Sequence, residues 1–230
     1  MLPALGWGAL AASSLLLGVA LALARPWGDR TIGIVLSFGA GALVSAVAFE
    51  LFEEGREAGG ELPVAAGLAA GALTYYVCDR SIERRGAGGG LPLALGALLD
   101  GVPEQAVLGI GLAGGEGVSV ALLVAIFVSN LPEGVGSASD MLRGRWSRRA
   151  IVGLWSGVAA ICLLATLAGY AVADAVSGEL TGAIDGFAAG ALLVMLVDSM
   201  VPEAARKGGR VAGLATTLGF AVAAGLSVTS

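Results

Sequence analysis

Two apolar stretches of the chain each contain a Pro-Glu pair, with further polar residues just before it. The first covers residues 99–104 and reads LDGVPE, and the second covers residues 128–134 and reads VSNLPEG. A carboxylate in the middle of an apolar run long enough to cross a membrane is energetically costly, and by default it marks a functional site. We therefore expect the chemistry of this protein between Leu91 and Leu142.

The spacing of these polar residues would gather oxygen atoms if both stretches are helical. Asp100 and Glu104 are four residues apart, so they would share one helix face. Ser129 and Asn130 precede Glu133 by four and three residues, so that face would also present oxygens. Ser129 is the weaker candidate, because serines in helices often bond to their own backbone.

The two prolines add backbone oxygens near these side chains. Inside a helix, Pro103 and Pro132 each remove one hydrogen bond and displace the carbonyl four residues earlier, at Leu99 and Val128. In a membrane such a carbonyl needs water, a side chain or a cation as a new partner. Two such helices facing each other would form an oxygen-lined cavity, which suits hard divalent cations.

The composition indicates a membrane protein and limits the ligands available to it. Of 230 residues, 57% are hydrophobic and 13% are charged, and the mean hydropathy is +0.87, as in polytopic membrane proteins. Histidine is absent, so a metal site would be built from oxygen ligands. Cys78 and Cys162 lack a disulfide or zinc spacing, which favours a packing role. The net charge of −5 is spread over several loops and indicates no nucleic-acid partner.

The sequence divides into eight apolar segments, most of them near the roughly 20 residues that a membrane-crossing helix needs. They cover residues 4–24, 32–52, 62–79, 91–112, 117–140, 149–174, 181–203 and 209–228. The first has no basic residue before it and exceeds the usual length of a signal-peptide core, so we expect a first transmembrane helix. The Gly-rich linker 86–90 is too short to separate soluble domains. Residues 1–230 are therefore expected to form one transmembrane domain.

The basic residues predict the orientation of this domain. Twelve of the 13 lie in the loops after the first, third, fifth and seventh segments, and only Arg56 lies on the opposite side. The positive-inside rule then places those four loops in the cytoplasm and both termini outside. The opposite loops are acidic or neutral, and we assign Asp185 to one of them.

The second and seventh segments resemble each other. Residues 38–44 parallel residues 187–193, and acids follow in both, namely Glu50, Glu53 and Glu54 in one and Asp198 and Glu203 in the other. The two segments would cross the membrane in opposite directions, which is typical of the inverted repeats of transporters. We expect an all-α bundle of 3+2+3 helices with the fourth and fifth in the middle. Glu203, beside Arg206 and Lys207, is interpreted as a salt-bridge partner.

These motifs resemble those of the ZIP (ZRT/IRT-like) family of divalent metal transporters, over nearly the whole chain. In that family the fourth helix carries His-Asn-x-Pro-Glu-Gly and the fifth His-(Glu/Asp/Asn)-x-Pro-Glu-Gly. Residues 100–105 and 129–134 match these motifs around their Pro-Glu pairs. Residues 198–204 are similar to the family's acidic-x-x-x-Pro-Glu-Ala ending, and residues 50–54 stand where the family often has His-Leu-x-Pro-Glu. The resemblance implies eight helices, both termini outside, and transport of a divalent metal.

The departures from the family pattern concern the metal ligands. Asp100 and Ser129 replace the two motif histidines, and Gly101 replaces the asparagine. The sixth segment has a Ser156-Gly157 step without the glutamate that many family members place after it. The resemblance therefore implies one cation site rather than two, formed by Asp100, Glu104, Asn130 and Glu133. Oxygen ligands favour Mn²⁺, Mg²⁺ or Fe²⁺, while zinc stays a candidate because carboxylates also bind it.

We therefore expect a multi-pass transporter of the inner or plasma membrane that moves a divalent metal toward the cytoplasm by alternating access. Asp198 would lie on the inner release path. Glu50 and Glu54 would lie on the outer approach, although a solvated helix end explains them equally well. The metal would be the substrate, with no cofactor, and the partners would be membrane lipid and this ion, with a homodimer left open.

Two other functions fit the same sequence. One is a carrier of the same fold for another cation or for protons, and the other is a membrane protein that senses metal without transporting it. The missing histidines favour the second, and the retained carboxylates argue against it. An enzyme is not expected, since no nucleophile–base pair is visible and histidine is absent.

Overall fold

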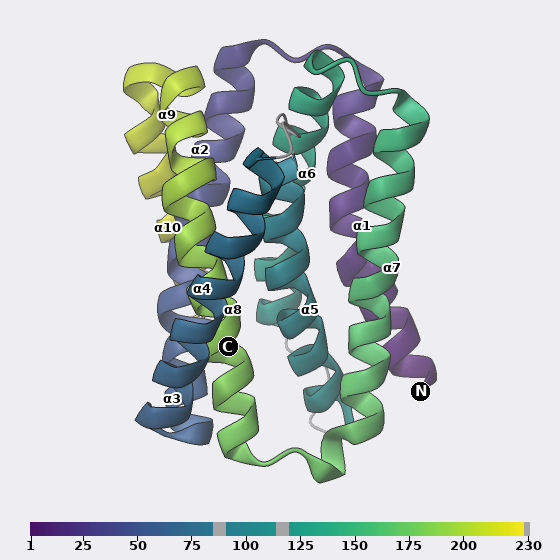
Figure 1. Cartoon of the computed structure of the whole chain (residues 1–230), viewed down its shortest axis with the longest axis vertical. Helices are drawn as coiled ribbons and strands as arrows, with labels where there is room; N and C mark the ends of the chain where they lie inside the picture. Colours follow the sequence, from purple (N-terminus) through teal and green to yellow (C-terminus); the bar gives the residue numbers. More distant parts are fainter. Residues whose placement is uncertain (85–90, 114–119, 228–230) are drawn as a thin grey trace.

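The computed structural model describes residues 1–84, 91–113 and 120–227, and helices make up nearly all of this part of the chain (Figure 1). The α-helices are α1 (Leu2–Ala24), α2 (Asp29–Ser45), α3 (Glu54–Gly59), α4 (Glu61–Arg84), α5 (Leu91–Ala113), α6 (Val120–Arg143), α7 (Arg148–Val172), α8 (Gly178–Met195), α9 (Val201–Gly208) and α10 (Ala212–Ser227). Wider π-helical turns, η1 (Ala46–Glu53) and η3 (Leu196–Met200), join α2 to α3 and α8 to α9. The 3₁₀ turns η2 (Ala173–Ala175) and η4 (Gly209–Val211) precede α8 and α10.

The helices are long and apolar enough to cross a membrane. In the described part of the chain six runs meet this condition, Leu2–Ala24, Asp29–Gly59, Glu61–Ser81, Ala94–Ala113, Arg148–Val172 and Gly178–Leu226. Large apolar side chains such as Leu73, Leu164 and Leu214 are exposed on the outside of the bundle, where lipid rather than water would solvate them. The prediction of an all-α protein with several membrane-length helices is confirmed.

The seventh and eighth predicted segments correspond to a helical run that turns back on itself. The run from Gly178 to Leu226 reverses direction after α9, so α10 returns antiparallel to α8 (Figure 1). Gly209 has a φ of 61° at this reversal, a backbone conformation that glycine adopts without steric cost. Gly60, with a φ of 84°, makes the corresponding reversal between α3 and α4. The helices thus extend beyond the predicted segment ends at residues 52 and 203.

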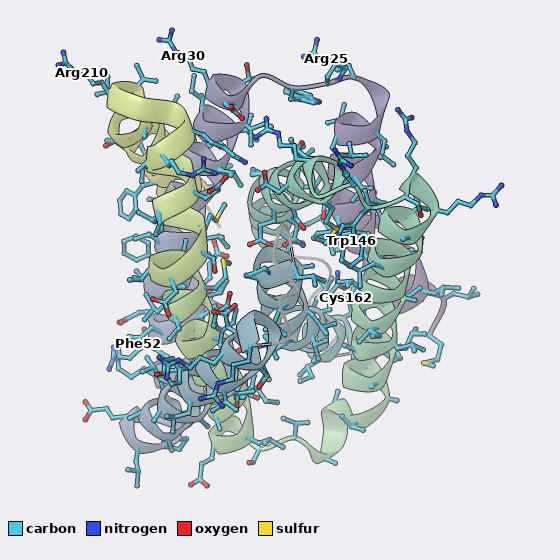
Figure 2. The ribbon with its side chains drawn as sticks, turned by 45° about the horizontal axis from the view of Figure 1, so that its top comes forward. Arg25, Arg30, Phe52, Trp146, Cys162 and Arg210 are labelled. Carbon is cyan, nitrogen blue, oxygen red and sulfur yellow. The ribbon has the colours of Figure 1, made fainter. Side chains whose placement is uncertain are left out.

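The arginines gather at one end of the bundle, which we name the basic end. Arg25, Arg30 and Arg210 point outward there from the helix connections (Figure 2). The helices α4 and α6 also finish at this end, at Arg84 and Arg143. The short helix α3, with Arg56, lies at the opposite end (Figure 1). Charge is therefore segregated along the bundle as the sequence predicted.

The helices form two groups, each with its own apolar core. The first group contains α1, α5, α6 and α7, with Leu15, Met141 and Trp155 fully buried in its centre. The second contains the remaining helices, with a core built mainly from α2 and α8 and the π-helical turns that follow them. Cys162 is buried in the core of the first group, which confirms the packing role expected for it.

The two halves of the chain repeat the same close contacts. A Cβ atom on Gly41 of α2 would overlap the carbonyl of Thr216 in α10, and one on Gly190 of α8 would overlap the carbonyl of Leu68 in α4. The short helices follow the same pattern, since α9 packs against α2 and α3 packs against α8. Small residues let these helix backbones meet directly. The pair α2–α10 is therefore built in the same way as the pair α8–α4.

Gly190 offers a direct test of this packing. Gly190→Val places a branched side chain against the α4 backbone, and overpacking of this kind costs about 1–3 kcal/mol or more. We expect the melting temperature of the detergent-solubilised protein to fall by several degrees, on the order of 2–4 °C per kcal/mol for a chain of this size. Gly153→Val in α7 is the matched control, because a Cβ there has no neighbour within 4 Å. Equal melting temperatures for the two variants would contradict the predicted contact.

Candidate cation site

The two Pro-Glu motifs lie inside continuous helices. Pro103 is an interior residue of α5, and Pro132 is an interior residue of α6. Both helices belong to the first group, and the second group packs against them through α8 and α2. The sequence correctly placed these prolines within helices, and the structure brings them to the boundary between the groups.

Glu133 is the most deeply buried acid of the motifs. It has no exposed surface, while Asn130 is 1% exposed and Glu104 is 4% exposed. Within the described part of the chain, neither carboxylate oxygen of Glu133 has a hydrogen-bond partner, and the Oδ1 atom of Asn130 also lacks one. Glu104 of α5 lies near enough for its charge to act on Glu133. The three side chains lie close together on α5 and α6, and in the described part of the chain the Glu133 oxygens and the Asn130 Oδ1 atom have no donor.

Buried acceptors of this kind require a positive partner. Burial of an unpaired carboxylate costs many kcal/mol, and proteins avoid this cost by binding a proton or a cation. Most buried polar atoms in native proteins have a partner, so an exception needs an explanation. Two carboxylates and one carboxamide oxygen form a suitable ligand set for a divalent ion, because their charge balances that of the ion.

The helices α1 and α2 pack closely against the helical turn that carries Glu133. A Cβ atom on Gly18 of α1 would lie 2.5 Å from the carbonyl oxygen of Leu131. One on Gly39 of α2 would lie 2.6 Å from the Cβ of Pro132 and 2.9 Å from Met200. These glycines let α1 and α2 close over both sides of the turn. They contribute close packing and no ligand.

The structure describes only part of the predicted ligand set. The side chains of Asp100 and Ser129 lie outside the described residues. Among the side chains that are described, no group of three or more acids or cysteines is close enough to hold a metal. The site as described therefore consists of Glu104, Asn130 and Glu133.

Gln105 follows Glu104 and stands where the family motif has glycine. Its carboxamide oxygen accepts a hydrogen bond from the hydroxyl of Thr166 in α7. The contact is buried and joins α5 to α7 beside the carboxylates. It is a positioning contact that the sequence did not reveal, since the two residues are 61 positions apart.

Asp198 lies in η3 and is exposed, in contrast to Glu133. The charges of both acids act on the phenol of Tyr75 in α4, so Tyr75 lies near both. The structure does not bring Asp198 into the group formed by Glu104, Asn130 and Glu133. Its predicted place on a release path stays a prediction.

Glu50 and Glu54 lie near the end of the bundle opposite the basic end. Glu50 is half-buried in η1, Glu54 is exposed in α3, and their charges act on each other. Asp185, which we expected in a loop, instead lies in α8 with 4% of its surface exposed and packs against Gly55. The loop assignment was wrong, because Asp185 lies two turns inside α8, within the apolar segment 181–203 itself. An acid within this Gly-rich apolar run was the signal that the sequence offered.

An ion-pair network joins several helices at the basic end. The ammonium group of Lys207 in α9 binds Asp140 of α6 and lies 2.6 Å from Glu203. Arg143 of α6 pairs with Asp29 of α2, and Arg206 lies 2.6 Å from Glu203. The interpretation of Glu203 as a salt-bridge partner is confirmed. The network connects α6 of the first group to α2 and α9 of the second, which the sequence did not predict.

Comparison with known proteins found a related sequence. No protein-family model matches the chain. Over 186 residues, or 75% of this chain, the sequence is 32% identical to a protein of Arabidopsis thaliana named "Putative zinc transporter". This relative confirms the resemblance to the ZIP family. The name of this relative describes a transporter, in agreement with the expectation that the chain is not an enzyme.

The match covers only part of the relative. The chain spans 30% of the length of the Arabidopsis thaliana protein. The similarity therefore concerns the 186 aligned residues alone. The activity and substrate of the whole relative are transferred to this chain only as a proposal.

Proposed function

We propose that this chain is a divergent ZIP-family carrier that moves a divalent metal ion across the inner or plasma membrane. The observation that carries this proposal is Glu133, a fully buried carboxylate whose two oxygens have no partner in the described part of the chain. A passing cation would supply that partner. The named relative and the six membrane-length runs support transport as the purpose of such a site.

We further infer that the single domain has eight membrane helices in a 3+2+3 arrangement, with both termini outside. The matched contacts of α2–α10 and α8–α4 support an inverted repeat. The π-helical turns η1 and η3, which occur at corresponding places in the two halves, support it further. The arginines at one end support a cytoplasmic assignment for that end.

In the proposed mechanism the ion exchanges its hydration shell for protein oxygens. Glu104 and Glu133 contribute two negative charges, which balance a divalent ion, and Asn130 contributes a neutral oxygen. Asp100 and Ser129 would complete the set. Movement of the two helix groups would then open the site to each side in turn. Glu50 and Glu54 would attract ions on the outer side, and Asp198 would accept them on the inner side.

The identity of the ion is proposed from two observations. The name of the relative favours zinc. The donor set lacks imidazole and thiolate, because the chain has no histidine, and it therefore suits Mn²⁺, Fe²⁺ or Mg²⁺ as well. We propose zinc and manganese as the first substrates to test.

The proposal predicts saturable uptake of zinc or manganese into vesicles that contain the purified protein. Uptake of one ion should be inhibited by the other, because both would occupy one site. Empty vesicles provide the control, and an interior pH dye reports proton flux in the same preparation. Metal binding without flux would instead support a metal sensor, and proton flux without metal uptake would support a proton carrier.

A further inference from the structure

Tyr75 is a fully buried tyrosine in the middle of α4. Its hydroxyl lies 3.1 Å from the carbonyl oxygen of Pro92 and 3.3 Å from the hydroxyl of Ser199. A carbonyl only accepts, so Tyr75 donates its proton to Pro92. The Ser199 hydroxyl is then free to donate to the Tyr75 oxygen. One phenol oxygen thus makes two buried hydrogen bonds to two different elements.

These two bonds cross the boundary between the helix groups. Tyr75 and Ser199 belong to the second group, through α4 and η3. Pro92 lies in the first turn of α5, which belongs to the first group and carries Glu104 farther along. Tyr75 therefore fastens the beginning of α5 to the second group, on the basic-end side of the cation site.

Several acids lie near this contact. The charges of Glu133, Asp198 and Asp79 all act on the Tyr75 phenol. Glu133 has no exposed surface, whereas Asp198 is exposed. Asp79 lies one helical turn beyond Tyr75, toward the basic end of α4. Tyr75 thus lies near the fully buried carboxylate of Glu133 and also near Asp198 and Asp79, of which Asp79 is closer to the basic end.

We propose that Tyr75 is the gate between Glu133 and the basic end, and that its hydroxyl keeps this gate closed by holding Pro92 to Ser199. The proposal deepens the proposed function, since a divalent cation leaving Glu133 toward Asp198 would have to pass this residue. For the ion to pass, the phenol must release the Pro92 carbonyl, which lets α5 separate from η3. Tyr75 acts here as a positioning residue and not as a permanent ligand.

The test uses Tyr75→Phe, which removes only the hydroxyl, and Tyr76→Phe as the matched control. Tyr76 is 44% exposed and its ring lies 5.1 Å from the Arg80 guanidinium on the outside of the bundle. The reporter is Ser137→Cys, introduced after Cys78 and Cys162 are replaced by alanine. Ser137 is buried, four residues beyond Glu133 toward the basic end of α6.

A membrane-impermeant thiol reagent is applied from the basic end, and the rate of modification is measured. Loss of two buried hydrogen bonds that exist only in the closed state should speed modification by about tenfold. Tyr76→Phe should leave the rate unchanged. A second reporter, Ser14→Cys in α1, is also buried and should stay slow in both variants, because the gate does not cover it.

The outcomes separate the gate from the proposed function. Equal modification of the Ser137→Cys reporter in Tyr75→Phe and Tyr76→Phe would overturn the gate. Faster modification at both reporters would indicate general loosening and would also overturn it. Faster modification at Ser137→Cys alone supports the gate, even if zinc or manganese uptake proves absent, in which case only the proposed function fails.

Discussion

Glu133→Gln is expected to abolish metal uptake and to leave the metal-free protein at least as stable as the wild type. The amide keeps the shape of the carboxylate but removes the charge that balances the ion. Removing one partner of a buried charge pair costs about 3–5 kcal/mol, which lowers the affinity for the ion on the order of a hundredfold or more. In the absence of metal the same substitution removes a buried carboxylate that has no hydrogen-bond partner among the described residues, and burial of such a charge is unfavourable.

The two effects are measured with the same purified protein. Uptake of zinc or manganese into vesicles reports transport, and the melting temperature with and without zinc reports binding. Zinc at 100 times its dissociation constant for the wild type should raise the melting temperature of the wild type by roughly 5–10 °C and that of Glu133→Gln by no more than about 2 °C. Glu57→Gln is the control, because Glu57 is exposed in α3 at the far end. Unimpaired uptake by Glu133→Gln would refute the proposed site.

Lys207→Met is expected to destabilise the protein strongly. The Lys207 side chain is 1% exposed and its ammonium group lies between Asp140 and Glu203. Methionine fills a similar volume but leaves both carboxylates without this cation. Breaking a buried ion pair costs about 3–5 kcal/mol, and we expect the lower part of this range because Arg143 and Arg206 remain nearby. The melting temperature should fall by roughly 10 °C.

Arg206→Met is the matched control for this prediction. The Arg206 side chain is 68% exposed and pairs with Glu203 on the surface, and exposed pairs of this kind contribute little to stability. Adding Asp140→Asn to Lys207→Met should recover part of the lost stability, since it removes one of the carboxylates left unpaired. A double-mutant cycle measures this coupling. If Lys207→Met were no less stable than Arg206→Met, the network would not hold α6 to α9.

The membrane helices and the buried acid could be predicted from the sequence because both follow from local patterns. Apolar runs of membrane length indicated the helices, and a Pro-Glu pair inside such a run singled out Glu133. The predicted ends at residues 52 and 203 were too early, because α3 and α9 are polar and continue the helices past the apolar stretch. Hydropathy alone does not reveal a helix that extends beyond its apolar part.

The contacts between distant residues could not be predicted. Lys207 and Asp140 are 67 positions apart, and Tyr75 and Ser199 are 124 positions apart. Such pairs depend on how α4, α6 and α9 pack, which no local spacing encodes. Lys207 in the sequence is simply one more basic residue in a basic loop. Its burial became visible only when α6 and α9 were placed side by side.

The burial of Lys207 has a practical consequence, because it is the only lysine in the chain. An amine-reactive reagent has no other side chain to modify, and a lysine-specific protease has no other cleavage point. In the folded protein both should act slowly, since the amine is enclosed by two carboxylates. The rate at which Lys207 is modified should therefore report opening of the basic end in the wild-type protein. Mass spectrometry can measure this rate in native membranes.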